Sequence, residues 1–281
     1  MDRNLLDKAS LPIFIILSLT GSALNVTCIG VFAKRPHIRR KIPNELLVHQ
    51  ACVDLFNTAI CCPYYVISLI LYFNNYNQVE KLWTFYDILI SISTWTSLLS
   101  FTLIGIDRFL AIHKPIWHND KVEIKHIRRS MMLVWILSLL FNVPYALKHF
   151  IVHFVTVAAS FIIFLINIIL YVATAVTAKR QLQLSPAAQL TTTDALQENI
   201  RKQREMKLVK KLLIMFVCFF TGFIITGVGQ LVQFIQLLQG DSRYLVVIMG
   251  EIFFAVISLI NPLFTLFKND FKIGSCIHRN S

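Results

Sequence analysis

Apolar residues along this chain are gathered into seven long blocks that hold few or no charged side chains. Four blocks, at 11–33, 130–147, 150–178 and 212–240, contain no Asp, Glu, Lys or Arg. The other three, at 46–79, 82–106 and 244–267, each contain a single acid: Asp54, Asp87 and Glu251. A helix needs about 20 apolar residues to cross a bilayer core of about 30 Å. Six blocks meet this length easily, and the block at 130–147 is near the lower limit.

This pattern predicts an all-α fold, a seven-transmembrane helix bundle that forms one domain over residues 1–281. The expected helices are 11–33, 44–74, 84–113, 130–147, 150–179, 204–239 and 244–267. Only Lys148 and His149 separate the fourth block from the fifth. A single helix over 130–178 would be about 70 Å long, more than twice the bilayer core. We therefore expect two crossings joined by a very tight turn.

Basic residues predict the orientation of the bundle. The chain carries a net charge of +12, and most of its Lys and Arg fall in 34–41, 114–129, 179–211 and 268–279. The opposite set of connections holds only Arg3, Lys8, Lys81, Lys148 and Arg243. Cytoplasmic loops of membrane proteins are enriched in Lys and Arg, so the N-terminus is expected outside and the C-terminus in the cytoplasm. This split accounts for the charge without a nucleic-acid partner.

Several polar residues stand inside the expected helices, where each is costly and needs a reason. They are Asn25, Asp54, Asp107-Arg108-Phe109, Trp135, Tyr171, Glu205, and Asn261-Pro262-Leu263-Phe264-Thr265, with Phe219 between the last two. In this order, one set on each helix, they resemble the motifs of rhodopsin-like (class A) G-protein-coupled receptors. The resemblance covers residues 11–271. It also implies a short amphipathic helix on the membrane surface at 268–276.

The resemblance implies a multi-pass plasma-membrane receptor. Such a receptor binds an extracellular ligand in the outer half of its bundle and activates a heterotrimeric G-protein at its cytoplasmic face. Its other partners would be membrane lipids. The alternative is a transporter or channel, but neither paired repeats nor matching broken helices are found. No enzyme motif such as His-Glu-x-x-His or Gly-x-Ser-x-Gly is present. No retinal is expected, because Ala255 stands where opsins carry their lysine.

Asp54 lies midway through the second expected helix, so it must face the interior of the bundle. Its expected oxygen neighbours are Asn25, Ser97, Ser258 and Asn261. By the resemblance, these residues would form a polar pocket for a sodium ion. A protonated carboxyl group with hydrogen bonds to its neighbours is the alternative. No other cofactor or metal is predicted.

The resemblance also implies an activation switch at the cytoplasmic end. Its residues would be Asp107, Arg108, Glu205, Tyr171, Asn261 and Pro262. A pair between Arg108 and Glu205 would hold helices three and six together, although Arg108 also suits simple orientation. Leu98, Ile163 and Phe219 would connect the ligand pocket to this switch, although ordinary packing explains them equally. Cys276 is either a palmitoylation site or an exposed thiol.

The chain departs from the family at several places. Trp83 stands near the position of the usual cysteine on helix three, Ile163 replaces the helix-five proline, and Thr265 replaces the final tyrosine of the helix-seven motif. The helix-six Trp-x-Pro becomes Phe223-Ile224-Ile225. Ile90 stands where amine receptors of the family carry an aspartate, which disfavours a simple monoamine.

A ligand pocket is expected around Glu251, the only charge within the seventh expected helix. It precedes Pro262 by eleven residues, which places it about 16 Å along the helix axis toward the outside. The other candidate ligand-binding residues are Asp87, Ile90, Thr94, Phe223, Thr226 and Gln230. Two acids in an apolar cavity favour a ligand with a positive group, such as a peptide amino terminus or a basic side chain. Alternatively, Glu251 pairs internally with Lys81, Lys148 or Arg243.

Overall fold

The structure is a computed structural model that describes residues 3–35, 41–146, 150–183, 203, 206–207, 209–210, 213–225 and 245–266. Within these ranges the chain forms helices and turns and no strand. This confirms the all-α fold. The helices are α1 (Arg3–Ala33), α3 (Ile42–Phe56), the π-helix η1 (Asn57–Cys61), α4 (Cys62–Phe73), α5 (Val79–His113), α6 (Pro115–Lys121), α7 (Ile124–Ala146), α8 (Phe150–Gln183), a helix at Leu213–Ile225, and α10 (Leu245–Leu266).

Four stretches of the described helices are long and apolar enough to cross a membrane. They are Lys8–Ala33, Ile42–Phe73, Val79–His113 and Ala158–Gln181. Shorter apolar helices run over Leu213–Ile225 and Ile248–Leu263. α7 is a single unbroken helix through its apolar residues. Together with the six stretches above it forms a seven-helix transmembrane bundle.

Several helices extend beyond the ranges expected from the apolar blocks. The first begins at Arg3, the third at Val79 and the fourth at Ile124, and the fifth ends at Gln183. The expected ranges stopped at charged residues, whereas Glu, Lys and Arg are themselves good helix formers. A helix therefore continues past the apolar segment into water. The short α6 was not predicted, and the expected surface helix at 268–276 lies outside the described residues.

The second long apolar stretch, Ile42–Phe73, contains a π-turn between the α-helices α3 and α4. Pro63 follows η1 and has no N–H to donate to the carbonyl four residues earlier. A proline inside a helix is accommodated by local widening of this kind. The turn carries Asn57 and Thr58, both of which are buried. Pro63 thus changes which side chains of this stretch face the interior.

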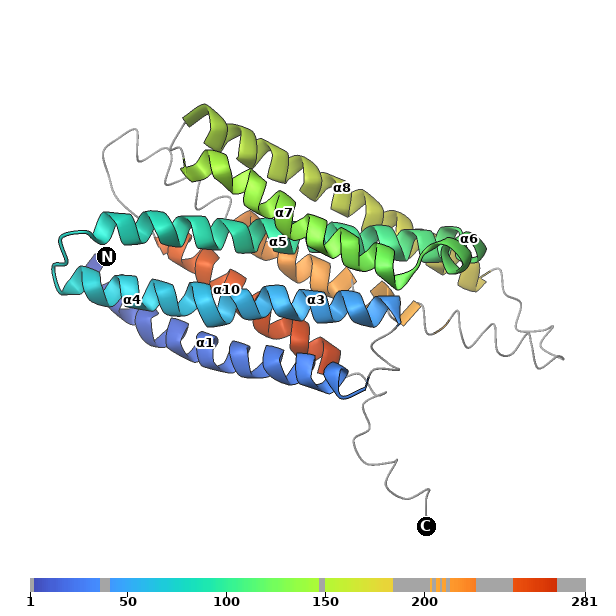
Figure 1. Ribbon diagram of the computed structural model, residues 1–281, viewed down its shortest axis with the longest axis horizontal. Coiled ribbons are helices and arrows are strands. Elements are labelled where there is room, and N and C mark those ends of the chain that lie inside the picture. The colour runs from blue at the N-terminus through green and yellow to red at the C-terminus, as the bar shows by residue number, and fades with distance from the viewer. Residues whose placement is uncertain are drawn as a thin grey trace, which may run out of the picture.

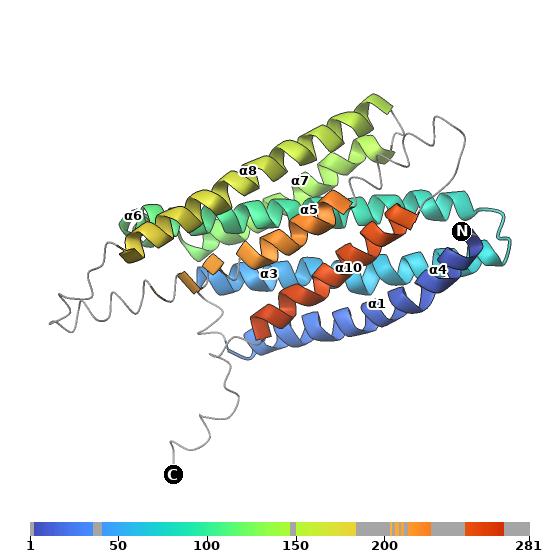
Figure 2. The same cartoon turned by 180° about the vertical axis from the view of Figure 1, so that it is seen from behind.

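α5 lies at the centre of the bundle. It contacts α3, α4, α6, α7 and α8, while α1 packs against α3, α4 and α10 (Figure 1). The start of α1, the start of α10 and the turn between α4 and α5 lie at one end of the bundle, here called the N-terminal end (Figure 2). Asn75 makes that turn with a φ of 55°, a left-handed conformation that Asn tolerates better than most residues. The start of α3, the end of α10 and α6 lie at the opposite end.

Candidate functional site

Asp54 is the centre of a buried polar network between α1, α3, η1 and α10. Its side chain accepts hydrogen bonds from Asn261 Nδ2 at 2.9 Å and from Gln50 Nε2 at 3.2 Å. Asn25 Nδ2 donates to the Ser258 carbonyl oxygen at 3.0 Å, and Asn57 Nδ2 donates to Ser258 Oγ at 3.0 Å. All six side chains are buried. The network therefore ties α10 to three neighbouring segments.

This network has more acceptors than donors. Four buried amide oxygens in it find no hydrogen-bond partner within the described residues: Asn25 Oδ1, Gln50 Oε1, Asn57 Oδ1 and Asn261 Oδ1. Buried polar atoms are nearly always paired, so unpaired oxygens beside a carboxyl group indicate a place for water or a cation. The donor set is carboxyl, amide and hydroxyl oxygen, which suits a hard cation rather than a transition metal. The residues present thus fit a sodium ion.

The structure brings together most of the polar pocket expected from the sequence. Asn25, Asp54, Ser258 and Asn261 are connected by hydrogen bonds, whereas Ser97 is buried on α5 with no hydrogen bond to Asp54 among the described groups. Sequence reasoning missed two members. Gln50 precedes Asp54 by four residues and so shares its helix face, which the sequence could have indicated. Asn57 could not be placed, because its orientation depends on the π-turn.

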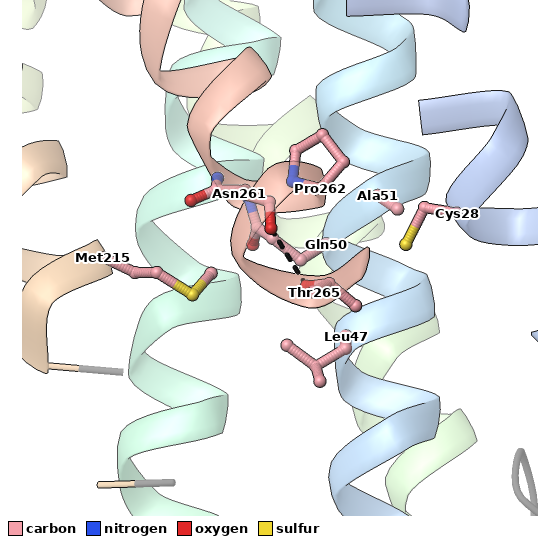
Figure 3. A pocket seen from close by; sticks show the side chains of 8 residues that line it. All are labelled: Cys28, Leu47, Gln50, Ala51, Met215, Asn261, Pro262 and Thr265. Atoms are coloured by element: carbon pink, nitrogen blue, oxygen red, sulfur yellow. Dashed lines mark hydrogen bonds between the residues drawn. The ribbon is translucent and has the colours of Figure 1, made fainter. Parts of the chain in front are cut away.

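A narrow pocket opens below the network, toward the end of α10 (Figure 3). Its lining comes from α1, α3, α10 and the helix at Leu213–Ile225, namely Cys28, Leu47, Gln50, Ala51, Met215, Asn261, Pro262 and Thr265. Thr265 Oγ1 donates to the Asn261 carbonyl oxygen at 2.9 Å. Thr265 is therefore turned back on its own helix. Its side chain lines the pocket together with Met215 and Leu47.

A second buried polar cluster lies at the end of α5 opposite to the N-terminal end. Arg108 Nε donates to Asp107 Oδ2 at 2.8 Å, and Arg108 Nη2 donates to the same oxygen. His118 Nε2 lies 2.9 Å from Asp107 Oδ1. A carboxylate only accepts, so the proton of this contact is on Nε2. All three side chains are buried.

His118 was not foreseen as a functional residue. It lies on α6, which begins at Pro115, and proline at the first helical positions favours a helix start. The short helix α6 places the His118 side chain next to Asp107, at the end of α5. The expected partner of Arg108, Glu205, lies outside the described residues, so the predicted pair with helix six stays a prediction.

Tyr171 and the expected connector residues lie in the largest apolar core. Tyr171 on α8 donates its hydroxyl to the Phe101 carbonyl oxygen at 3.1 Å, and its ring stacks on Phe216 with centroids 4.6 Å apart. Leu98 and Phe219 are buried in the same core, and Ile163 packs against it. The three connector residues thus lie in or against one core, which ordinary packing also explains.

The expected ligand residues are only partly described. Asp87, Ile90 and Thr94 are half-buried on α5, and Phe223 packs against the largest core. Thr226 and Gln230, like Cys276, lie outside the described residues. Ala255 is buried in a second apolar core.

Glu251 is half-buried on α10, and the next residue, Ile252, packs against the second apolar core. Of its expected basic partners, Lys81 donates to Gln78 Oε1 at 3.4 Å. Lys148 and Arg243 lie outside the described residues.

Comparison with known proteins finds a family model that matches part of the chain. Residues 24–149 match the family model described as 7 transmembrane receptor (rhodopsin family). This segment is similar to receptors of the rhodopsin-like family. It includes the Asp54 network partners on α1, α3 and η1, and the whole Asp107–Arg108–His118 cluster. The family consists of receptors and not of enzymes.

Curated relatives match about the same part of the chain. The Tyramine receptor Ser-2 of Caenorhabditis elegans is 31% identical over 132 residues, which are 46% of this chain and 28% of the relative. The D(1)-like dopamine receptor of Takifugu rubripes is 26% identical over 140 residues, 50% of this chain and 29% of the relative. The D(1B) dopamine receptor of Mus musculus is 26% identical over 132 residues, 47% of this chain and 26% of the relative. The matched part thus spans less than a third of these relatives.

Proposed function

We propose that the protein is a G-protein-coupled receptor that binds an extracellular ligand in the outer half of its bundle and activates a heterotrimeric G-protein at its cytoplasmic face. The observation that carries the proposal is the buried Asp107–Arg108–His118 cluster, which lies within the segment of the receptor family. A transporter or channel is not favoured, because the relatives are named as receptors.

The cluster supports a switch because the charged guanidinium group of Arg108 is held in a poorly solvated place. Arg108 is buried with its guanidinium turned onto Asp107 of its own helix, and His118 holds the other carboxylate oxygen. Buried charges are tolerated only while they stay paired. A protein that offers Arg108 new acceptors at this end would release it from Asp107. The G-protein is the partner that we assign to this end.

The distribution of basic residues supports the orientation. Lys114, Lys121, Lys125 and Arg129 are exposed at the end of the bundle that holds the cluster. Positive residues concentrate on the cytoplasmic side, so this end faces the cytoplasm and the N-terminal end faces outward in the plasma membrane. The basic surface is also suited to anionic lipid head groups.

The test is a panel of heterotrimeric G-proteins in cells, run first without ligand and then with pooled amines, peptides and lipids. The wild type should activate at least one G-protein above the level of cells that lack the receptor. His118→Phe should raise basal activation, because it frees one oxygen of Asp107 and loosens the hold on Arg108. His126→Phe, at an exposed position on α7, is the matched control and should change nothing. Silence across the whole panel would contradict the proposal.

We also propose that Asp54 and the unpaired oxygens of Asn25, Asn57 and Asn261 hold a sodium ion. The support is the excess of buried acceptors around a single carboxyl group. Sodium should raise the thermal midpoint of the detergent-solubilised receptor relative to N-methylglucamine at equal ionic strength, since a ligand of the folded state stabilises it. Asp54→Asn should abolish this difference. A wild type indifferent to sodium would instead favour water in the pocket.

A further inference from the structure

α6 presents two sides of different character. On one side, His118 is buried and contacts Asp107 at the end of α5. On the other, the two large apolar side chains of this seven-residue helix, Ile116 and Trp117, are 78% and 48% exposed. Apolar surface is driven out of water, so the outer side of α6 calls for a surface that covers it.

The lipid-facing residues of the neighbouring helices show where the bilayer ends. Toward this end of the bundle, the last large exposed apolar residue of α7 is Met132, and the exposed Arg129 lies one turn further. On α8 the last is Val176, with the exposed Lys179 one turn further. Exposed Lys and Arg next to an apolar band mark the membrane surface. α6 begins at Pro115, directly after α5 ends, so it lies at this level (Figure 1).

The outer side of α6 combines an aromatic ring with positive charge. Lys121 follows Trp117 by four residues, so the two side chains share one face of the helix. Lys114 and Lys121 are exposed, and so is one acid, Asp120. Trp is enriched at membrane surfaces, and a Lys beside it can lay its stem along apolar groups while its ammonium group stays in water.

The bilayer fits this side of the helix better than a protein partner does. Head groups and the upper acyl chains surround the bundle at this level, so they are available to Trp117 without any other molecule. The cytoplasmic leaflet also carries negative charge, which complements the excess of lysine over acid on α6. Position and charge thus point to the same occupant.

We propose that α6 docks on the anionic cytoplasmic surface of the bilayer through Trp117, with Ile116 and Lys121 beside it, and that this contact holds His118 against Asp107. The docking rests on the proposed orientation of the bundle, and its effect on the cluster rests on the proposed receptor function. Anionic lipid then favours the resting arrangement, because α6 can move away from Asp107 only by giving up its contacts with the bilayer.

The first measurement is the quenching of tryptophan fluorescence by lipid. The full-length protein is placed in nanodiscs of phosphatidylcholine whose acyl chains are brominated near the head group, and in discs without bromine. The chain has four Trp residues, so the emission of Trp117 is the difference between the wild type and Trp117→Phe. Bromine should remove most of this difference. A difference that bromine leaves unchanged would overturn the docking. Trp117→Tyr replaces the Phe variant in the subtraction if that variant does not fold.

The second measurement is hydrogen exchange of the α6 backbone in discs with and without phosphatidylserine. The amides to follow are those of His118 and Val122, which donate within this segment at 2.9 Å and 3.0 Å. Both should exchange more slowly with phosphatidylserine present. Lys121→Gln should reduce this protection about fivefold, which corresponds to about 1 kcal/mol for one Lys at an anionic surface. Lys81→Gln, exposed at the other end of α5, is the matched control and should leave it intact.

Two results would overturn the docking on the anionic surface. One is equal exchange of α6 in the two kinds of disc. The other is a Trp117 that bromine does not quench but that becomes shielded when a G-protein is added, which would assign the outer side of α6 to a protein partner.

The effect on the cluster is tested by nucleotide exchange on a G-protein without ligand. Phosphatidylserine should lower this basal exchange for the wild type, and His118→Phe should no longer respond to it. Equal basal exchange of the wild type in both kinds of disc would refute the hold on His118. A silent G-protein panel together with a quenched Trp117 would instead refute the receptor function and leave the docking in place.

Discussion

Two sides of the bundle are held together by different chemistry. Where α10 meets α1, α3 and η1, the contact contains directed hydrogen bonds, such as Asn25 to Ser258 and Asn261 to Asp54. Where α8 meets the helix at Leu213–Ile225, the contact is a ladder of rings. Phe164 stacks on Phe220 at 4.5 Å and on Phe223 at 5.2 Å, with interplanar angles of 4° and 9°.

The two sides differ in how freely their helices can shift relative to one another. Hydrogen bonds weaken steeply outside a narrow range of distance and angle, so the polar side fixes the register of its helices. Stacked rings tolerate offsets, so parallel rings can slide past one another at small cost. Lipid supplies no hydrophobic force between helices, which leaves packing and hydrogen bonds as the main attractions. We therefore interpret the polar side as the fixed frame and the aromatic side as the movable one.

The largest effect should come from crowding the polar side. A Cβ added to Gly21 would lie 2.5 Å from Thr58 Cγ2, too close for any real contact, and Thr58 is held by its hydrogen bond to the Asp54 carbonyl oxygen. Gly21→Ala should therefore destabilise the protein by about 1–3 kcal/mol. The measurement is the thermal midpoint of the purified protein.

Gly30 offers the matched control on the same helix. Nothing lies within 4 Å of a Cβ placed there. Gly30→Ala should hold or raise the thermal midpoint, because Ala is favoured over Gly in a helix by about 0.5–1 kcal/mol. Equal losses in the two variants would contradict the close approach of α1 to η1.

A smaller effect should follow from cutting the aromatic ladder. Phe164→Leu keeps an apolar side chain but removes the stacking on Phe220 and Phe223, which is worth about 0.5–1.5 kcal/mol. Phe161→Leu changes an exposed ring on the same helix, tilted against Phe164 with centroids 6.3 Å apart, and should cost less. If the ladder permits movement, Phe164→Leu should alter ligand-induced signalling more than Gly30→Ala does. Equal stability and equal signalling of the two Phe variants would contradict a role for the stacked rings.

The smallest effect is expected at one of the polar contacts between α8 and α5. Asn167 Nδ2 on α8 donates to Thr102 Oγ1 on α5 at 2.8 Å and also to the Ile163 carbonyl oxygen at 3.1 Å. Thr102→Val leaves the second bond in place, so the loss should be about 0.6 kcal/mol, the typical value for such bonds in membranes. Thr221→Val removes only a local bond to the Val217 carbonyl oxygen and serves as control. A drop as large as that of Gly21→Ala would show that the two sides are equally rigid.

The sequence predicted the helical bundle and much of the Asp54 network, because intramembrane polar residues must face inward wherever the helices pack. Asp54 could be placed by that argument, and Asn25 and Asn261 by the resemblance to the receptor motifs. Asn57 could not, since its orientation depends on the π-turn that Pro63 imposes. His118 could not be placed either. Its contact with Asp107 requires α6, a seven-residue helix that the apolar blocks do not predict. The positions of both residues depend on turn geometry, which composition and hydrophobic pattern do not predict.

The central claim is that the cluster at the end of α5 is the switch of a G-protein-coupled receptor. Its most direct test is nucleotide exchange on purified G-proteins by the receptor in nanodiscs, with Arg108→Ala compared with Arg129→Ala. Both variants remove one positive charge, but Arg108 is buried on Asp107 and Arg129 is exposed. The account predicts that Arg108→Ala lowers exchange at least about tenfold, a loss of about 1.4 kcal/mol, while Arg129→Ala stays near wild type. Full exchange by a folded Arg108→Ala receptor would contradict it.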